Sequence, residues 1–265
     1  MLYFPQLLPG ATVQYPIVKR RVQRNIVSLT LGGRLLKLLD PGGARTEWEL
    51  TFQALTSEER EYLEVFFSAA EGKLGEFTFL DPTDNLLLQS DELAEVAWSK
   101  GPALGLAANV ADPDGGTQAT SIHNAGAVPE SLQQAIAGPG DFHYCFSLYA
   151  RSDTPANLAM FRSVGGTEES ITQYVQSSWK RLVHSGRSSS AEAGVTFGIR
   201  IDPGAQVEVF GMQAEAQIAP SNYRRTTLRC GVYEKARFDQ DVLRLTSEGP
   251  EQHSGALRIV AFPNS

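Results

Sequence analysis

The fold of the first part of the chain is decided by the stretch RTEWELTFQALTSEEREYLEVFFSAAEGKLGEFTFLDP, residues 45–82. Its first part alternates with the two-residue period of a strand, because Trp48, Leu50 and Phe52 are separated by polar residues. One face of this strand is therefore apolar and the other is polar. We expect the apolar face to be covered by another element.

The middle of the stretch predicts a helix over residues 57–70. Thr56 can cap its first turn, and Glu59 stands three residues later, as a capping box requires. Phe66 and Phe67 fall on a broad apolar face, and Gly72 is a plausible stop. The aromatic face indicates that the helix packs on a sheet.

The end of the stretch, GEFTFLDP, predicts a strand after the helix that Pro82 brings to an end. Before the stretch, residues 12–54 are rich in β-branched residues and read as strands, with a turn expected at Asp40–Gly43. After it, residues 86–95 read as a connector. The first domain is thus expected to be α+β with one helix, over residues 1–95.

From residue 96 onwards the pattern changes to short strands punctuated by Gly, Pro, Ser and Asp. This spacing predicts an antiparallel β-sandwich of the jelly-roll kind over residues 96–230. Residues 231–265 read as a hairpin, and because a lone hairpin is marginal in water, we expect it to return to the sheet of the first domain. The fold class is therefore mainly β.

The charge of the chain is unevenly distributed. The formal net charge of the 265 residues is −7, but residues 1–39 hold six cations and no acid, which leaves −13 for the rest. An acidic body argues against specific binding of nucleic acid, and no apolar run reaches the ~18 residues of a membrane span. The basic stretch predicts an oligomer contact, for which the candidates are Lys19, Arg20, Arg21 and Arg24. A solvated strand face explains the same residues equally well.

Motifs of known enzyme classes, such as H-E-x-x-H, a Walker loop or G-x-S-x-G, do not occur in the sequence, so we expect no enzyme and no organic cofactor. Asp112 and Asp114 precede two glycines and could hold a structural calcium ion. A turn between strands explains the same residues without a metal. Aromatic residues of the sandwich are candidates for contact with a sugar, although such residues commonly belong to the core: Tyr144, Tyr149, Tyr174 and Trp179.

The stretch 45–82 resembles phage tail proteins of the distal-tail and minor-tail group. The resemblance covers about residues 15–85, and it rests on the alternating strand, the Thr-Ser-Glu-Glu helix start, the Phe66-Phe67 pair and the final Phe-x-Phe-x-Asp-Pro. Residues 96–230 are similar to jelly-roll modules, akin to carbohydrate-binding modules, that occur in tail and fibre proteins. The strongest carrier is Gly211-x-Gln213-x-Glu215 followed by Pro220-Ser221-x-Tyr223-x-x-Thr226.

The resemblance implies a structural virion protein at the tail tip of a phage or phage-like particle, made in the host cytoplasm. It implies a homo-oligomeric ring, a hexamer in this family, whose partners are the tail tube and hub proteins. The alternative is a carbohydrate-binding module that attaches the particle to a glycan of the host surface. These two functions stay open together, because such modules decorate tail rings.

Overall fold

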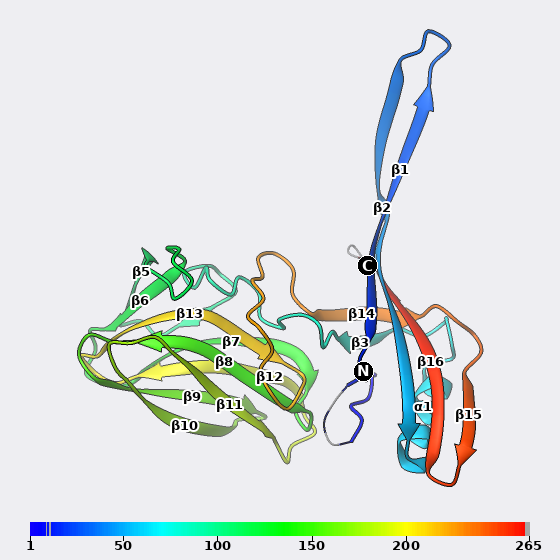
Figure 1. The fold of residues 1–265 in the computed structure, drawn as a ribbon. Coiled ribbons are helices and arrows are strands. Elements are labelled where there is room, and N and C mark those ends of the chain that lie inside the picture. The colour runs from blue at the N-terminus through cyan, green and yellow to red at the C-terminus, as the bar shows by residue number, and fades with distance from the viewer. Residues whose placement is uncertain (9, 11, 263–265) are drawn as a thin grey trace. The chain divides into compact units, whose positions relative to one another are not determined.

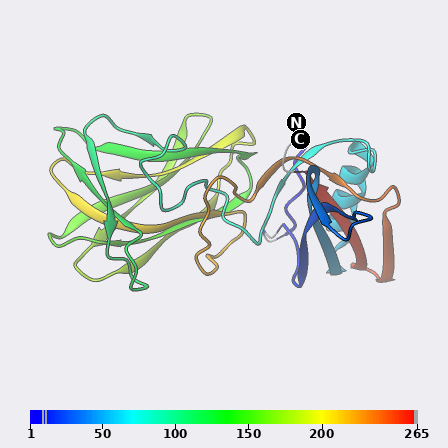
Figure 2. The same ribbon diagram turned by 90° about the horizontal axis from the view of Figure 1, so that it is seen from above.

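The structure is a computed structural model that describes residues 1–8, 10 and 12–262, with Pro41 described by its backbone alone. The chain divides into two compact units (Figure 1, Figure 2). Unit 1 comprises residues 1–79 and the C-terminal stretch from Tyr233, and unit 2 comprises Leu80–Val232. Strands predominate in both units, which confirms the expected fold class.

Unit 1 is built on one sheet in the order β1-β2-β16-β14-β3, with β15 added beside β16. The last strand of the chain pairs with β2, where Leu257 lies opposite Leu50 and Ile259 opposite Trp48. These four side chains are at most 1% exposed. The strands of unit 1 are β1 (Ile17–Leu29), β2 (Leu35–Leu55), β3 (Phe77–Leu80), β14 (Val232–Phe238), β15 (Arg244–Gly249) and β16 (Gln252–Ala261).

The helix α1 (Ser57–Ala69) covers this sheet and has the predicted capping box. The Thr56 side chain accepts a hydrogen bond from the Glu59 amide, and the Glu59 carboxylate accepts one from the Thr56 amide. Phe66 is 8% exposed and packs edge-on against Phe77 of β3, at 5.1 Å between ring centroids. Phe67 is half-buried against Phe238.

Strand β3 is the segment FTFL that the sequence predicted after the helix, and all four of its residues are buried. Beyond it, the chain enters unit 2 earlier than expected. Leu86, Leu87 and Leu93 are at most 3% exposed and belong to the core of the sandwich. The expectation of a connector at residues 86–95 is therefore wrong, because these leucines are core residues and not part of a solvated linker.

Unit 2 is a sandwich of two five-stranded sheets, in the orders β10-β9-β12-β7-β4 and β11-β8-β13-β6-β5. Inward-facing aromatic and aliphatic side chains of both sheets fill the space between them. The strands are β4 (Ser99–Lys100), β5 (Leu104–Val110), β6 (Ala119–Asn124), β7 (Glu130–Pro139), β8 (His143–Arg151), β9 (Ala156–Val164), β10 (Thr167–Val175), β11 (Lys180–Arg187), β12 (Ala193–Ile201) and β13 (Gln206–Glu215).

The outer half of the β1–β2 hairpin extends beyond the rest of the sheet (Figure 1). Its pairing with β16 ends at Thr46. Beyond a register shift between Val22 and Arg24, the two strands pair only with each other among the residues that the structure describes. We call residues 24–40 the arm. The chain reverses at its tip, where the Gly33 amide donates to the Thr30 carbonyl.

The turn expected at Asp40–Gly43 is therefore wrong, because these residues lie at the register shift inside β2. Glycine is common in both β-bulges and turns, because both need unusual backbone dihedral angles or a close approach of two backbone segments. A Cβ atom on Gly43 would lie 2.5 Å from the Arg24 Cβ atom, so a larger residue could not sit there without a shift of the partner strand.

Candidate binding surfaces

The motif around Gln213 and Tyr223 forms a buried polar network on the outer side of β13. Gln213 and Glu215 are at most 1% exposed. The Gln213 Oε1 atom accepts the Arg224 amide at 2.7 Å, and the Glu215 carboxylate accepts both the amide and the hydroxyl of Ser221. The side chains of Gln213 and Glu215 thereby hold the segment that follows β13 against β13 itself.

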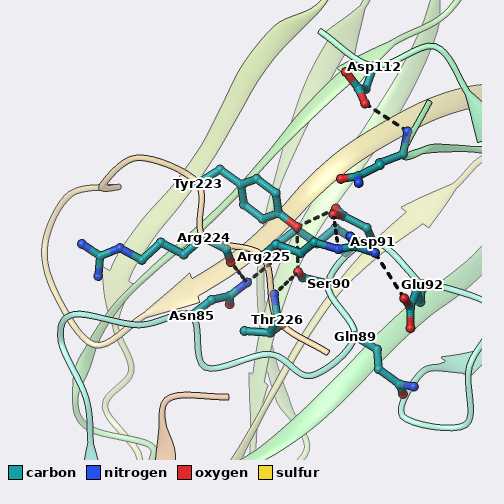
Figure 3. A network of polar contacts seen from close by, with 12 residues as sticks. Asn85, Gln89, Ser90, Asp91, Glu92, Asp112, Tyr223, Arg224, Arg225 and Thr226 are labelled. Carbon is teal, nitrogen blue, oxygen red and sulfur yellow. Dashed lines mark hydrogen bonds and ion pairs between the residues drawn. The ribbon is translucent and has the colours of Figure 1, made fainter. Parts of the chain in front are cut away.

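Tyr223 connects this segment to an earlier part of the chain (Figure 3). Its hydroxyl donates to the Asp91 carboxylate and lies 2.7 Å from the Ser90 Oγ atom. The ring lies over Gly211, whose φ is +67° and where a Cβ atom would approach the ring to 3.2 Å. A glycine is thus required at this position by both the backbone and the ring.

Asn85 and Thr226 close the network. The Asn85 amide group donates to the Met212 carbonyl, and its Oδ1 atom accepts the amides of Leu87 and Ala214. The Thr226 hydroxyl donates to the Leu87 carbonyl. The motif is therefore a clamp that binds three backbone segments together, and its polar atoms are largely occupied by the protein itself.

The pKa values of the two buried aspartates near the clamp are shifted in opposite directions. Burial raises the pKa of Asp91 above its usual range, although the Tyr223 hydroxyl and the Arg225 guanidinium, 3.4 Å away, oppose this effect. Backbone amides lower the pKa of Asp112, with the Gln118 amide contributing most. Asp91 also lines a cavity of about 320 Å³ with Glu92 and Arg225.

The geometry of the Asp112 loop is that of a turn held by one carboxylate. Its Oδ1 atom accepts the amides of Asp114 and Gly116, and its Oδ2 atom accepts the amide of Gln118. Asp114 is exposed. Among residues 1–8, 10 and 12–262, no group of three or more His, Cys, Asp and Glu side chains could hold a metal ion. Calcium at this loop stays a prediction from the sequence.

The structure separates the four aromatic candidates. Tyr144 is fully buried and its hydroxyl donates to the Pro139 carbonyl, so it is a core residue and the expectation of sugar contact there is wrong. The ring of half-buried Tyr149 lies under the Arg181 guanidinium, and that of Trp179 under the Arg151 guanidinium at 4.9 Å. Tyr174 is 58% exposed.

Tyr174 lies beside a cavity of about 290 Å³ between the edge strands β10 and β11. Gln173, Gln176, Ser178 and Lys180 line the same cavity. Their side-chain polar groups form no hydrogen bond within the described part of the chain. An exposed ring beside free amide, hydroxyl and ammonium groups can contact a sugar, which offers both an apolar face and hydroxyls.

The basic candidates are mostly satisfied within their own chain. Arg20 forms an ion pair with Glu49 at 2.9 Å, and Arg24 forms one with Asp40 at 2.5 Å. Lys19 lies over the rings of Trp48 and Tyr233. These three cations therefore have partners within their own chain, and the oligomer contact stays a prediction from the sequence. Arg21 has no ion pair in the part of the chain that the structure describes.

The arm exposes a group of aliphatic side chains that the sequence-based predictions did not include. Eight of its aliphatic side chains are between 46% and 112% exposed. They are Ile26, Val27, Leu29, Leu31, Leu35, Leu36, Leu38 and Leu39. The signal was present in the sequence as two aliphatic runs on either side of Gly32-Gly33, which is a hairpin pattern.

Comparisons with known proteins give distant structural neighbours. No family model matches the sequence, and no curated protein matches it. Among solved structures, TmCBM61 in complex with β-1,4-galactotriose is 16% identical, with a TM-score of 0.38, and the match covers 49% of this chain and 97% of that one.

Two further structures have similar values. The CBM22-1 xylan-binding domain of Paenibacillus barcinonensis Xyn10C is 14% identical with a TM-score of 0.39, covering 53% of this chain and 99% of that one. The enzymatically active domain of bacteriophage CBA120 tailspike protein 4 is 11% identical with a TM-score of 0.39, covering 52% of this chain and 22% of that one. The first two neighbours bind carbohydrate and the third is a phage tailspike domain, and likenesses of this size assign no ligand to the present chain. No helix in the described part of the chain is long and apolar enough to span a bilayer.

Proposed function

We propose that this protein is a structural subunit that assembles with copies of itself, as a distal-tail-like ring at the tip of a phage tail that links the tube to the baseplate. The observation that carries the proposal is the arm. A two-stranded ribbon with no other strand beside it is marginal in water. The arm is a ribbon of this kind, and it also exposes eight aliphatic side chains to solvent.

An exposed apolar surface of this kind marks a protein interface. Burying a fully exposed Leu or Ile contributes about 1.5–3 kcal/mol. Eight partly exposed side chains can therefore offset an association cost of about 4–15 kcal/mol. The arm supplies the free energy for assembly, and unit 2 would be displayed by the assembled ring.

The test is the mass of the purified protein in solution, compared with that of a variant without the arm. Val22 and Arg45 lie opposite each other in the hairpin, so an Asn-Gly turn can replace residues 23–44 without a change of register. We expect the intact protein to be an oligomer and the shortened variant to be a monomer with an unchanged circular dichroism spectrum. A monomeric intact protein would contradict the proposal.

A second function, attachment to a glycan, is favoured by the cavity beside Tyr174. The measurement is binding to an array of bacterial surface glycans, with Tyr174→Ala and Tyr174→Phe compared with the wild type. We expect Ala to abolish binding and Phe to retain it, because the ring supplies the stacking surface. As a control, Ile218→Ala changes an exposed residue outside the cavity lining. Absence of binding by the wild type would exclude this function.

A further inference from the structure

Both faces of the arm carry apolar side chains, but the two faces differ in charge. Residues directly opposite each other in an antiparallel pair lie on the same face. Ile26 and Leu38 therefore share one face with the Arg24–Asp40 ion pair. The other face carries Val27 opposite Lys37 and Leu29 opposite Leu35. We call this second face, with Leu39, the lysine face.

The cations nearest the tip have no partner of their own. Lys37 on the lysine face and Arg34 at the tip have no ion pair among the described residues. A partner of this face should therefore be apolar along its middle and acidic beside it, so that both the leucines and the cations are satisfied.

The outer face of α1 has this composition. Glu58, Glu61, Tyr62 and Val65 are spaced by three and four residues and form one stripe along the helix. Tyr62 is 44% and Val65 is 61% exposed, although both are large apolar side chains. Three exposed glutamates of the helix, Glu58, Glu61 and Glu64, stand against Arg60, which pairs with Glu64 at 3.7 Å, so this face is acidic. The Glu61 carboxylate has no ion pair or hydrogen bond within the described residues.

The lengths of the two surfaces also match. A helix of thirteen residues is about 20 Å long, and the six strand residues from Arg24 to Leu29 span about 20 Å. Within one copy the surfaces cannot meet, because α1 follows the C-terminal end of β2 and the arm contains its N-terminal end (Figure 1). From Leu39 to Leu55 the strand spans about 50 Å.

We propose that the lysine face of one copy's arm lies along the outer face of α1 in a neighbouring copy. This inference rests on the proposed assembly function and names its acceptor surface. The contact joins two different surfaces, so it is head-to-tail, and such contacts form rings when the rotation between copies closes. Lys37 and Arg34 then face Glu61 and Glu64, and the leucines of the arm cover Tyr62 and Val65.

A charge swap tests this contact by analytical ultracentrifugation. Arg34→Glu with Lys37→Glu should weaken association by about tenfold or more, and so should Glu61→Lys with Glu64→Lys, because each places like charges opposite each other. Combining all four changes should restore association. The control, Glu234→Lys with Asp239→Lys, makes the same change of charge on exposed residues of unit 1 outside α1 and should have no effect.

The outcomes separate the inference from the function beneath it. The inference is wrong if the wild type assembles and the Glu61→Lys, Glu64→Lys variant assembles equally well. It is also wrong if the variant with all four changes does not regain association. In either case the arm docks elsewhere, and the proposed assembly function is unaffected. If the wild type is a monomer at all concentrations, both fall. A direct check mixes a Leu35→Cys copy with a Val65→Cys copy, each carrying Cys230→Ser. After addition of a mild thiol oxidant, which takes up the two electrons, a disulfide between the two copies supports the contact, and its absence in the assembled oligomer overturns it.

Discussion

At the scale of the residue, the recognisable motif of unit 2 has a structural role. Gln213 and Glu215 accept hydrogen bonds from backbone amides, and Tyr223 donates one to Asp91. Little of their polar surface is therefore left for a ligand. The motif could be read from the sequence, but its role could not, because its partners Asn85 and Asp91 lie more than a hundred residues away. Contacts of that range leave no periodic signal.

The two buried aspartates predict opposite effects of pH on the free energy of unfolding. The pKa of Asp112 lies below its ordinary value of 3.8 in the folded state, so its contribution is present above that value and is lost as the pH falls through the lowered pKa. The pKa of Asp91 is raised, so its contribution is greatest below 3.8 and is lost as the pH rises through the raised pKa.

Urea melts at several pH values between about 3 and 7 can measure both effects. Asp112→Asn should lower stability at neutral pH by about 1.5–3 kcal/mol, because a charged acceptor of three amides is lost, and the deficit should shrink in acid. Asp91→Asn should cost less at neutral pH than in acid. If the two variants show the same dependence on pH, the assignment of these shifts is wrong.

At the scale of the element, α1 was the best predicted part of the chain because all its signals are local. The capping box, the spacing of the apolar residues and the glycine beyond the end each act within a few residues. The bulge at residues 41–44 was mistaken for a turn because both use Pro and Gly, and only pairing with β1 distinguishes them. The leucines between residues 86 and 93 were assigned to a connector, although they pack into the core of the sandwich, which lies far from them in the sequence.

The burial of the helix predicts a graded effect of its aromatic residues on stability. Phe66→Ala should lower the free energy of unfolding of unit 1 by about 3–5 kcal/mol, since a buried ring is removed and a cavity remains. Phe67→Ala should cost less, because Phe67 is half-buried. Val65→Ala is the control and should change the free energy of the isolated subunit by less than about 0.5 kcal/mol. Equal losses for Phe66 and Val65 in denaturant melts would contradict the packing.

At the scale of the whole molecule, the described residues form two hydrophobic cores with no buried residue in common. The core of unit 1 depends on residues from both ends of the chain, since β16 lies between β2 and β14. The sequence indicated two kinds of pattern but not where they divide, because the boundary after Phe79 falls inside a strand. Only the packing of Phe79 and Leu80 into different cores reveals it.

Separate cores predict that unit 1 can be unfolded without unit 2. Ile259→Asp places a carboxylate at a fully buried position of β16, which costs several kcal/mol unless the group is neutralised. Hydrogen exchange should then accelerate in β2 and β16 and stay slow in β8 and β13. The neighbouring change Arg258→Asp, at an exposed position, should leave both units protected. Faster exchange throughout the sandwich in Ile259→Asp would show that the units depend on each other.

The strands on either side of unit 2, β3 and β14, are neighbours in the sheet of unit 1. Where the chain enters and leaves unit 2, the Asp81 amide donates to the Gly231 carbonyl at 2.8 Å. The two ends of the inserted segment are therefore held together by the sheet of unit 1 and by this hydrogen bond, independently of the packing of the sandwich. Closely spaced ends of this kind favour the insertion of one domain into another. A different domain whose ends lie equally close could be exchanged at residues 80 and 232, and lineages could change what is displayed while inheriting the scaffold unaltered.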